Sequence, residues 1–314
     1  MEELIHSLVQ KVRAGDARSL ARAISLVENR ADGWLQLLKA LFPHTGRART
    51  IGLTGAPGAG KSTLVDQLAL HYRKQDHHIG IIAVDPTSPY SGGAILGDRI
   101  RMQRHFADPA IYIRSMATRG SLGGLASATA DIATVLDASG RDLILVETVG
   151  VGQDEVDIVR LADVTVVILV PGMGDDVQSI KAGIMEIADI FVINKSDHEG
   201  AERVEREIRA LQSLAARSDD WAPPIVKTVA SSSQGIAELA IEIQKFEDHM
   251  KGHDFLARRK AHNWQTRLLE MLRDSLMAKA RTQLSDEKLN QYAAEIAAHK
   301  RDPYSLIEEI AKAL

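Results

Sequence analysis

The chain has 314 residues, with 38 Lys and Arg against 42 Asp and Glu, a formal charge of −4, and no cysteine. This length fits one large domain or two small ones, and 45% hydrophobic residues are enough for a sizeable core. The absence of cysteine excludes disulfides, thiolate zinc sites, a cysteine nucleophile and iron–sulfur clusters. The mild negative charge and the 4% aromatic content argue against nucleic acid as a partner.

Residues 1–45 are predicted to form helices. An apolar stripe at helical spacing indicates the first helix, and its members are Leu4, Ile5, Leu8, Val9 and Val12. The Gly15-Asp16 step interrupts this pattern, and Asp16 is a suitable N-cap for a second helix that carries Leu20, Ile24 and Val27. Pro43 closes the region.

Targeting signals are not evident in the sequence. The N-terminus is amphipathic and begins with acidic residues, unlike a signal peptide. No apolar run approaches the ~18 residues of a membrane-spanning helix. The sequence therefore predicts a soluble cytoplasmic protein without a membrane partner.

Residues 46–250 alternate apolar runs with amphipathic stretches. The predicted strands are Thr50–Thr54, Ile79–Asp85, Ala110–Arg114, Leu143–Glu147, Val164–Val170, Ile190–Asn194 and Ile225–Thr228. The predicted helices are Ser62–Gln75, Gly124–Ser139, Ile180–Ala188, Glu202–Ala216 and Ile236–Lys251. Several strands are almost wholly apolar, as in a parallel sheet that helices cover on both faces. We therefore expect an α/β fold with a doubly wound, mostly parallel sheet.

Residues 251–314 return to helix alone. Apolar residues recur through 254–282, and Asp302-Pro303 supplies an N-cap and a first-turn proline for a last helix. Two interpretations stay open from the pattern: a helical hairpin packed on its own domain, or an oligomerisation arm. The expected organisation is a helical extension over 1–45, a nucleotide-binding domain over 46–250, and a C-terminal helical arm over 251–314.

The segment GAPGAGKST is the strongest motif, because an apolar strand precedes it and a helical pattern follows it. Its residues are Gly55, Ala56, Pro57, Gly58, Ala59, Gly60, Lys61, Ser62 and Thr63. They match the phosphate-binding loop G-x-x-x-x-G-K-[ST]. Glycines let backbone N–H groups converge on phosphate oxygens, and the helix N-terminus adds its dipole. Lys61 is predicted to reach the β- and γ-phosphates, and the Ser62 hydroxyl to bind magnesium.

A second motif selects the base. Asn194, Lys195 and Asp197 form N-K-x-D at the end of an apolar strand. An Asp carboxylate there can accept hydrogen bonds from guanine N1–H and from the 2-amino group, a donor pair that adenine lacks. A polar turn explains such a motif when it stands alone, but its place after a phosphate loop favours GTP.

Three carboxylates between the motifs are candidate magnesium ligands, and two of them, Asp85 and Asp98, are alternatively candidates for orienting water. Glu147 and Asp85 end apolar strands, where P-loop proteins hold magnesium directly or through water, and Asp98 lies in a glycine-containing loop. Gln153, in the glycine-rich segment after Glu147, is a candidate for positioning water. A strand-end cap, a solvated loop charge and a surface glutamine are the structural alternatives. No arginine finger is assigned among the nearby Arg99, Arg101, Arg104, Arg114 and Arg119.

Together these segments resemble the MeaB/ArgK/MMAA group of GTPases, within the SIMIBI class of P-loop proteins. The resemblance runs through AGDARSLARAISLVEN, GAPGAGKST, VDPTSPYSGGAILGDRIRM, RGSLGGLA, VETVGVGQDEVDI, ADVTVVILVPGMGDDVQSIKAGIMEIADIFVINKSD and DPY. The departures are Thr87 where Ser is commoner, Ser196 where Ala is usual, and VASSSQG in place of S-A-x-x-G-x-G. By similarity, that last loop assigns Val229, Ala230 and Ser231 to the base side of the nucleotide.

The resemblance implies a GTPase chaperone of an adenosylcobalamin-dependent acyl-CoA mutase, chiefly methylmalonyl-CoA mutase or a relative such as 2-hydroxyisobutyryl-CoA mutase. Members of the group gate cofactor loading and protect the mutase. Asp85, Asp98 and Glu147 would surround magnesium, Gly172–Lys181 would be a switch that faces the mutase, and the C-terminal helices would form a homodimer arm. Adenosylcobalamin would belong to the partner, while GTP or GDP and Mg²⁺ would bind this chain.

Two other functions are alternatives for this sequence. A GTPase that inserts nickel would need Cys or His ligands, and the chain has only scattered His such as His71, His77 and His78. Adjacent histidines do not share one helix face, which makes a polar helix end the simpler explanation for them. A P-loop kinase would need a substrate pocket with a catalytic base, and N-K-x-D argues against ATP.

Overall fold

The computed structural model describes residues 1–85, 102, 105, 107–117, 124–148, 162–172, 187–213, 220–252 and 254–313. Its strands are β1 (Arg49–Gly55), β2 (Ile79–Asp85), β3 (Ile111–Ala117), β4 (Leu143–Glu147), β5 (Val164–Leu169), β6 (Ile190–Asn194) and β7 (Ile225–Thr228). They form one seven-stranded sheet in the order β3-β2-β4-β1-β5-β6-β7, and every neighbouring pair is parallel. The predicted doubly wound α/β fold is confirmed.

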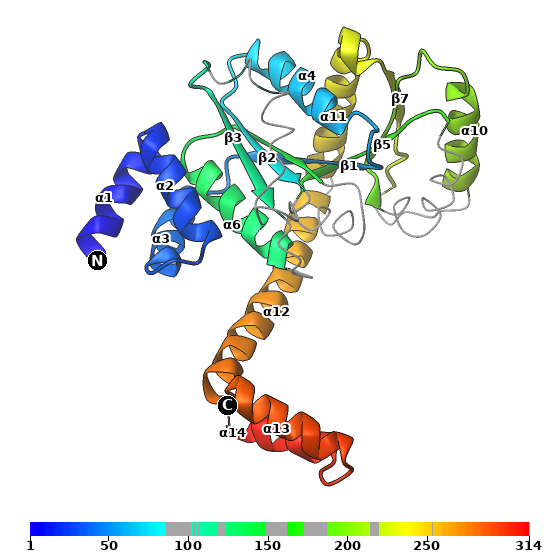
Figure 1. Ribbon diagram of the computed structural model, residues 1–314. Coiled ribbons are helices and arrows are strands. Elements are labelled where there is room, and N and C mark those ends of the chain that lie inside the picture. The colour runs from blue at the N-terminus through cyan, green and yellow to red at the C-terminus, as the bar shows by residue number, and fades with distance from the viewer. Residues whose placement is uncertain are drawn as a thin grey trace. The chain divides into compact units, whose positions relative to one another are not determined.

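Helices cover both faces of this sheet (Figure 1). Helices α4 (Lys61–Arg73) and α11 (Ile236–Gly252) pack on one face. Helices α6 (Gly124–Ala138) and α10 (Ala201–Gln212) pack on the other. Strand β4 shows the alternation, because Leu145 joins the first core and Val146 the second, and each is at most 1% exposed. Burial of such a side chain contributes about 1.5–3 kcal/mol.

The N-terminal extension contains α1 (Glu2–Arg13), α2 (Ala17–Glu28) and α3 (Trp34–Leu41), followed by the short 3₁₀ helix η1 (Phe42–His44). Asp16 caps α2 as predicted, since its carboxylate accepts a hydrogen bond from Ser19 N at 2.7 Å. Leu4, placed in the predicted stripe, is instead 48% exposed. The other stripe residues are buried and share one core with α6 and β4.

Polar contacts hold the segment that links this extension to β1, and also join the extension itself to β3. The Asp137 carboxylate on α6 accepts hydrogen bonds from the backbone N–H groups of residues 46, 47 and 48, which lead into β1. Arg114 on β3 pairs with Glu28 on α2. Arg114, one of the arginines near the predicted switch region, therefore has a structural partner.

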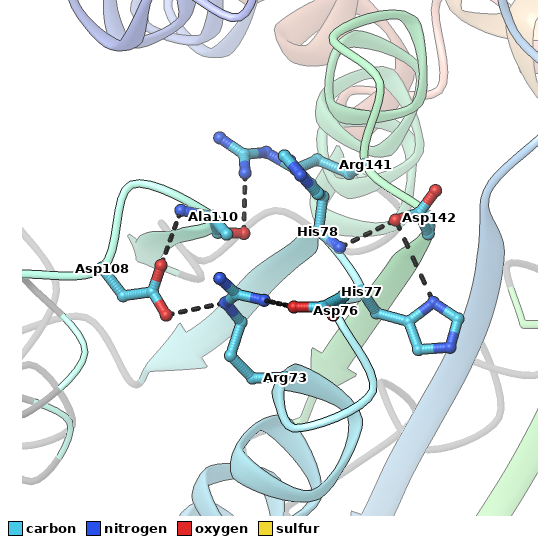
Figure 2. A network of polar contacts seen from close by, with 8 residues as sticks. All are labelled: Arg73, Asp76, His77, His78, Asp108, Ala110, Arg141 and Asp142. Carbon is cyan, nitrogen blue, oxygen red and sulfur yellow. Dashed lines mark hydrogen bonds and ion pairs between the residues drawn. The ribbon is translucent and has the colours of Figure 1, made fainter.

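A polar network joins the loops at the amino ends of β2, β3 and β4 (Figure 2). Asp108 accepts hydrogen bonds from Arg73 Nε at 2.7 Å and from Ala110 N at 2.9 Å. Burial raises the pKa of Asp108, but these two hydrogen bonds, together with electrostatic attraction to Arg73 and His105, hold that pKa below its ordinary value. His78 N donates to the Asp142 carboxylate at 2.7 Å. This edge lies opposite the phosphate-loop motif and serves to tie loops together.

Contacts divide the chain into two compact units, Met1–Lys260 and Ala261–Leu314. The C-terminal helices are α12 (Phe255–Gln283), α13 (Asp286–Ala297) and α14 (Pro303–Ala313). Asp302 caps α14 as predicted, because its carboxylate accepts from Ser305 N at 2.8 Å. Exposed apolar side chains are frequent along α12, namely Trp264, Leu268, Leu269, Met271, Leu272, Leu276 and Met277. In the described part of the chain, no helix is both long and apolar enough to span a membrane.

The first turn of α12 is anchored within the first unit. The Arg259 guanidinium makes a bidentate contact with the Asp189 carboxylate, at 3.0 and 2.8 Å, and Asp189 is 1% exposed. The same carboxylate accepts from Thr165 N at 2.9 Å. Asp189 immediately precedes β6, so this buried ion pair fixes the strand that carries Asn194 at its other end.

Candidate nucleotide site

Four strands bring the candidate residues to one edge of the sheet. Gly55, Glu147, Asn194 and Thr228 are the last residues of β1, β4, β6 and β7. All four strands are parallel, so these carboxyl ends lie along the same edge. Ligands of open α/β sheets bind outside this edge. The sheet topology thus gathers residues that lie far apart in the sequence.

The loop between β1 and α4 depends on glycine. Gly55, Gly58 and Gly60 have φ angles of +148°, +79° and +87°, which disfavour residues with a side chain. A Cβ at Gly55 would collide with the Ile168 carbonyl oxygen, and a Cβ at Gly60 with Asn194 Nδ2. Close backbone approach to two neighbouring strands therefore requires glycine at both positions.

Lys61 begins α4 and lies against the loop that precedes it. Its Nζ donates to the Gly55 carbonyl at 2.7 Å and to the Ala56 carbonyl at 3.1 Å. The side chain is 6% exposed. An ammonium group is thus held where the loop meets the N-terminus of α4, and that terminus itself attracts anions.

Ser62 and Glu147 meet beside the loop. Ser62 Oγ donates to Glu147 Oε1 at 2.7 Å, and the two residues are 6% and 3% exposed. The next residue, Thr148, joins its strand to β1, since its Oγ1 donates to Thr54 Oγ1 at 3.1 Å. A hydroxyl from α4 and a carboxylate from β4 are therefore adjacent and buried, as expected of two magnesium ligands in a P-loop protein.

The N-K-x-D turn contacts the phosphate loop directly. Asn194 Nδ2 donates to the Ala59 carbonyl at 2.8 Å, and Lys195 Nζ donates to the Gly58 carbonyl at 2.9 Å. Lys195 has φ +55°, which turns the chain sharply after β6. Asp197 follows on the surface with its side chain 56% exposed, where its carboxylate is accessible to a base.

The loop after β7 lies next to this turn. Ala230 N donates to Asn194 Oδ1 at 3.1 Å, and Val229 and Gln234 form a β-bridge that encloses the short 3₁₀ helix η4 (Ala230–Ser232). Ser233 Oγ donates to Gln67 Oε1 on α4 at 2.7 Å. The loop that contains Val229, Ala230 and Ser231 is therefore tied to both N-K-x-D and α4.

Several predicted residues lie outside the described part of the chain. Asp98, Gln153 and most of Gly172–Lys181 are among them, as are Arg99, Arg101, Arg104 and Arg119. Asp85 ends β2 as predicted, but its side chain is not described. Conversely, Thr228 is a site residue that no sequence motif predicted: its Oγ1 donates to Asn194 Oδ1 at 3.0 Å. The only signal was its place at the end of a strand.

The fold and the edge-site geometry define a P-loop nucleotide-binding protein. The parallel sheet, the glycine loop that enters α4, and the turn after β6 together characterise this class. The chain belongs to the family described as "Methylmalonyl Co-A mutase-associated GTPase MeaB", whose match covers residues 20–285. It is accordingly a GTPase, which hydrolyses GTP to GDP and phosphate.

Individual relatives agree with this assignment. A putative GTPase of Pyrococcus abyssi is 46% identical over 312 residues, which are 98% of this chain and 96% of that protein. The mitochondrial methylmalonic aciduria type A homolog of Mus musculus is 35% identical over 286 residues, 85% of this chain and 69% of that one. A crystal structure titled as an LAO/AO transport system kinase has a TM-score of 0.73 at 26% identity, and covers 99% of this chain and 98% of the other.

Proposed function

We propose that GTP binds along the carboxyl edge of the sheet, with its phosphates in Gly55–Thr63 and its base beside N-K-x-D. The direct contacts of Asn194 and Lys195 with the phosphate loop support this placement, because they set the two halves of one site side by side. In this proposal the Lys61 ammonium moves from loop carbonyls to the β- and γ-phosphate oxygens. Asp197 accepts the two guanine hydrogen bonds.

Magnesium fits the Ser62–Glu147 pair. Hard oxygen donors suit this ion, and it takes its remaining ligands from phosphates and water. The two donors are buried and adjacent, at 2.7 Å. In this proposal Ser62 and Glu147 would hold Mg²⁺ together with Asp85 and Asp98, and the bound ion would supply positive charge beside the γ-phosphate. Gln153 positions the attacking water.

The base-side loop completes the proposed pocket. Val229, Ala230 and Ser231 would lie beside guanine, held there by the bond from Ala230 N to Asn194 Oδ1 and by the bridge between Val229 and Gln234. Ser231 is exposed. Its hydroxyl is therefore accessible to the base or ribose.

We further propose that the GTPase acts as a chaperone that gates adenosylcobalamin loading and protects a cobalamin-dependent acyl-CoA mutase. The single observation that carries this proposal is the match of residues 20–285 to a mutase-associated family. The partner is methylmalonyl-CoA mutase or a relative such as 2-hydroxyisobutyryl-CoA mutase. Adenosylcobalamin belongs to the mutase, and this chain contributes the nucleotide switch in the cytoplasm.

We propose the domain organisation that the sequence predicts. It consists of a helical extension over 1–45, the GTPase domain over 46–250 and a dimerisation arm over 251–314. The exposed apolar side chains of α12 support the last assignment. A single chain leaves those side chains in water, and patches of this kind mark association surfaces. A second copy of the chain is the proposed occupant.

The chaperone proposal predicts slow intrinsic hydrolysis that the mutase accelerates. GTPases that obtain an activating group in trans gain about 10³- to 10⁵-fold, so purified methylmalonyl-CoA mutase should raise kcat for GTP at least tenfold. Phosphate release is measured with and without the mutase, and Lys61→Ala serves as the inactive control. An unchanged rate with every cobalamin-dependent acyl-CoA mutase tested would contradict the proposal and leave the GTPase assignment intact.

A further inference from the structure

The buried amide of Asn194 has one permitted orientation. Ala230 N, a donor only, lies 3.1 Å from Asn194 Oδ1, so that atom must be the amide oxygen. Thr228 Oγ1 donates to the same oxygen at 3.0 Å. The amide NH₂ is thereby directed to the Ala59 carbonyl at 2.8 Å. Thr228 and Asn194 are 0% and 2% exposed, which removes water as a substitute partner.

This amide supports the phosphate loop from the base side. Asn194 holds the Ala59 carbonyl, and Lys195 holds the carbonyl of the preceding Gly58. A peptide unit is planar, so fixing a carbonyl also fixes the N–H of the next residue. The contact is close, since a Cβ on Gly60 would collide with Asn194 Nδ2. The loop conformation that presents N–H groups to phosphate therefore depends on the orientation of Asn194.

We propose that Thr228 is a positioning residue for phosphate binding, although it belongs to β7 on the base side of the site. Its hydroxyl and Ala230 N together hold the Asn194 amide oxygen, and Asn194 in turn holds the phosphate loop in its binding conformation. The inference rests on the proposed nucleotide site and adds a property to it: phosphate affinity is set in part by a residue that contacts neither phosphate nor magnesium. A loss at Thr228 should then be independent of the base.

Thr228→Val tests this, because valine keeps the shape of threonine and lacks the hydroxyl. One buried hydrogen bond corresponds to about a 5- to 30-fold change in affinity. The dissociation constants of GTP, ITP and XTP should therefore rise by that factor, and by the same factor for all three. Thr228→Ser keeps the hydroxyl and should restore most of the affinity. Should the valine variant not fold, Thr228→Ala also lacks the hydroxyl and carries the same test.

Thr165→Val is the matched control. Thr165 is also 0% exposed and is the second residue of β5, near the amino ends of the strands and away from the candidate site. Among the described residues, none is hydrogen-bonded to its Oγ1. The same substitution there should leave the three dissociation constants unchanged. Equal losses at Thr165 and Thr228 would assign the effect to general packing and overturn the proposal.

A double-mutant cycle with Asn194→Ala tests the route of the effect. If Thr228 acts through Asn194, then Thr228→Val adds no further loss in the Asn194→Ala background. Additive losses would overturn the proposal, as would wild-type affinity of Thr228→Val or a loss confined to GTP. Failure of the unsubstituted protein to bind any guanine nucleotide would instead contradict the proposed nucleotide site, and is distinct from all these results.

Discussion

Replacement of Lys61 by alanine should lower kcat for GTP hydrolysis by about 10²- to 10³-fold, the usual cost of removing one group that stabilises transition-state charge. The ammonium is held at the junction of the phosphate loop and α4, within 2.7 Å of the Gly55 carbonyl. Without it, the charge that develops on the γ-phosphate has no cationic side chain from the loop. Single-turnover phosphate release at saturating GTP measures the effect on the chemical step.

Lys74→Ala is the control for this substitution. Lys74 is the C-cap residue of the same helix and is exposed, so its removal changes net charge equally but at the far end of α4. It should hydrolyse GTP at the parent rate. Should Lys61→Ala also retain the parent rate, the assignment of the phosphate loop is wrong.

Asp197→Asn should change which base the protein prefers. The carboxylate accepts two donors from guanine, whereas an amide can donate to the 2-oxo group of xanthine. Charged hydrogen bonds contribute about 1.5–3 kcal/mol each, so loss of the two should lower GTP affinity about 10²- to 10⁴-fold while XTP affinity rises. Equilibrium titration with fluorescent analogues of GTP and of XTP gives the dissociation constant of each nucleotide.

The neighbouring Glu199 provides the matched control, because it lies in the same exposed turn. Glu199→Gln removes one negative charge without touching the N-K-x-D motif and should keep the preference for GTP. An Asp197→Asn variant that still prefers GTP over XTP to the parent extent would refute base recognition by this carboxylate. Stability is not expected to change in either variant, since both side chains lie at the surface.

The sheet could be read closely from the sequence because its strands are buried on both faces. Strands β4, β6 and β7 match their predicted bounds, and each apolar run ends at a polar residue. The edge strand β3 fits less well: it was predicted as Ala110–Arg114 and spans Ile111–Ala117. The polar residues Arg114 and Ser115 interrupt the apolar run within this strand, so the apolar pattern defines its end weakly.

Helices that lack side-chain caps were harder to place. Helix α3 was not predicted separately, and it starts after Gly33, a left-handed N-cap without a side-chain bond. Helix α4 ends at Arg73 rather than Gln75. Helix α10 was predicted as Glu202–Ala216 and spans Ala201–Gln212. By contrast, Asp16 was found because its carboxylate supplies a recognisable cap.

For the site, the motifs predicted which strand ends would meet but not how they touch. No sequence pattern indicates the contact of Asn194 with Ala59 or the turn at Lys195, whose φ is +55°. The role of Thr228 could not be predicted from the sequence either. A buried threonine at a strand end is common, and its role here depends on its hydrogen bond to Asn194 in β6. Spacing predicts proximity, whereas hydrogen-bond direction requires coordinates.

The most direct test of the chaperone proposal is co-purification of this chain with a panel of cobalamin-dependent acyl-CoA mutases. The experiment is done once with GDP and once with a non-hydrolysable GTP analogue. The chaperone proposal predicts a stable complex with one member, methylmalonyl-CoA mutase or a close relative, whose affinity for this chain differs between the two nucleotide states. The mutase must bind the GTP-bound and GDP-bound forms of this chain with different affinities. A partner that binds both forms equally does not shift the equilibrium between them. The chaperone proposal would be contradicted if no mutase bound in either nucleotide state.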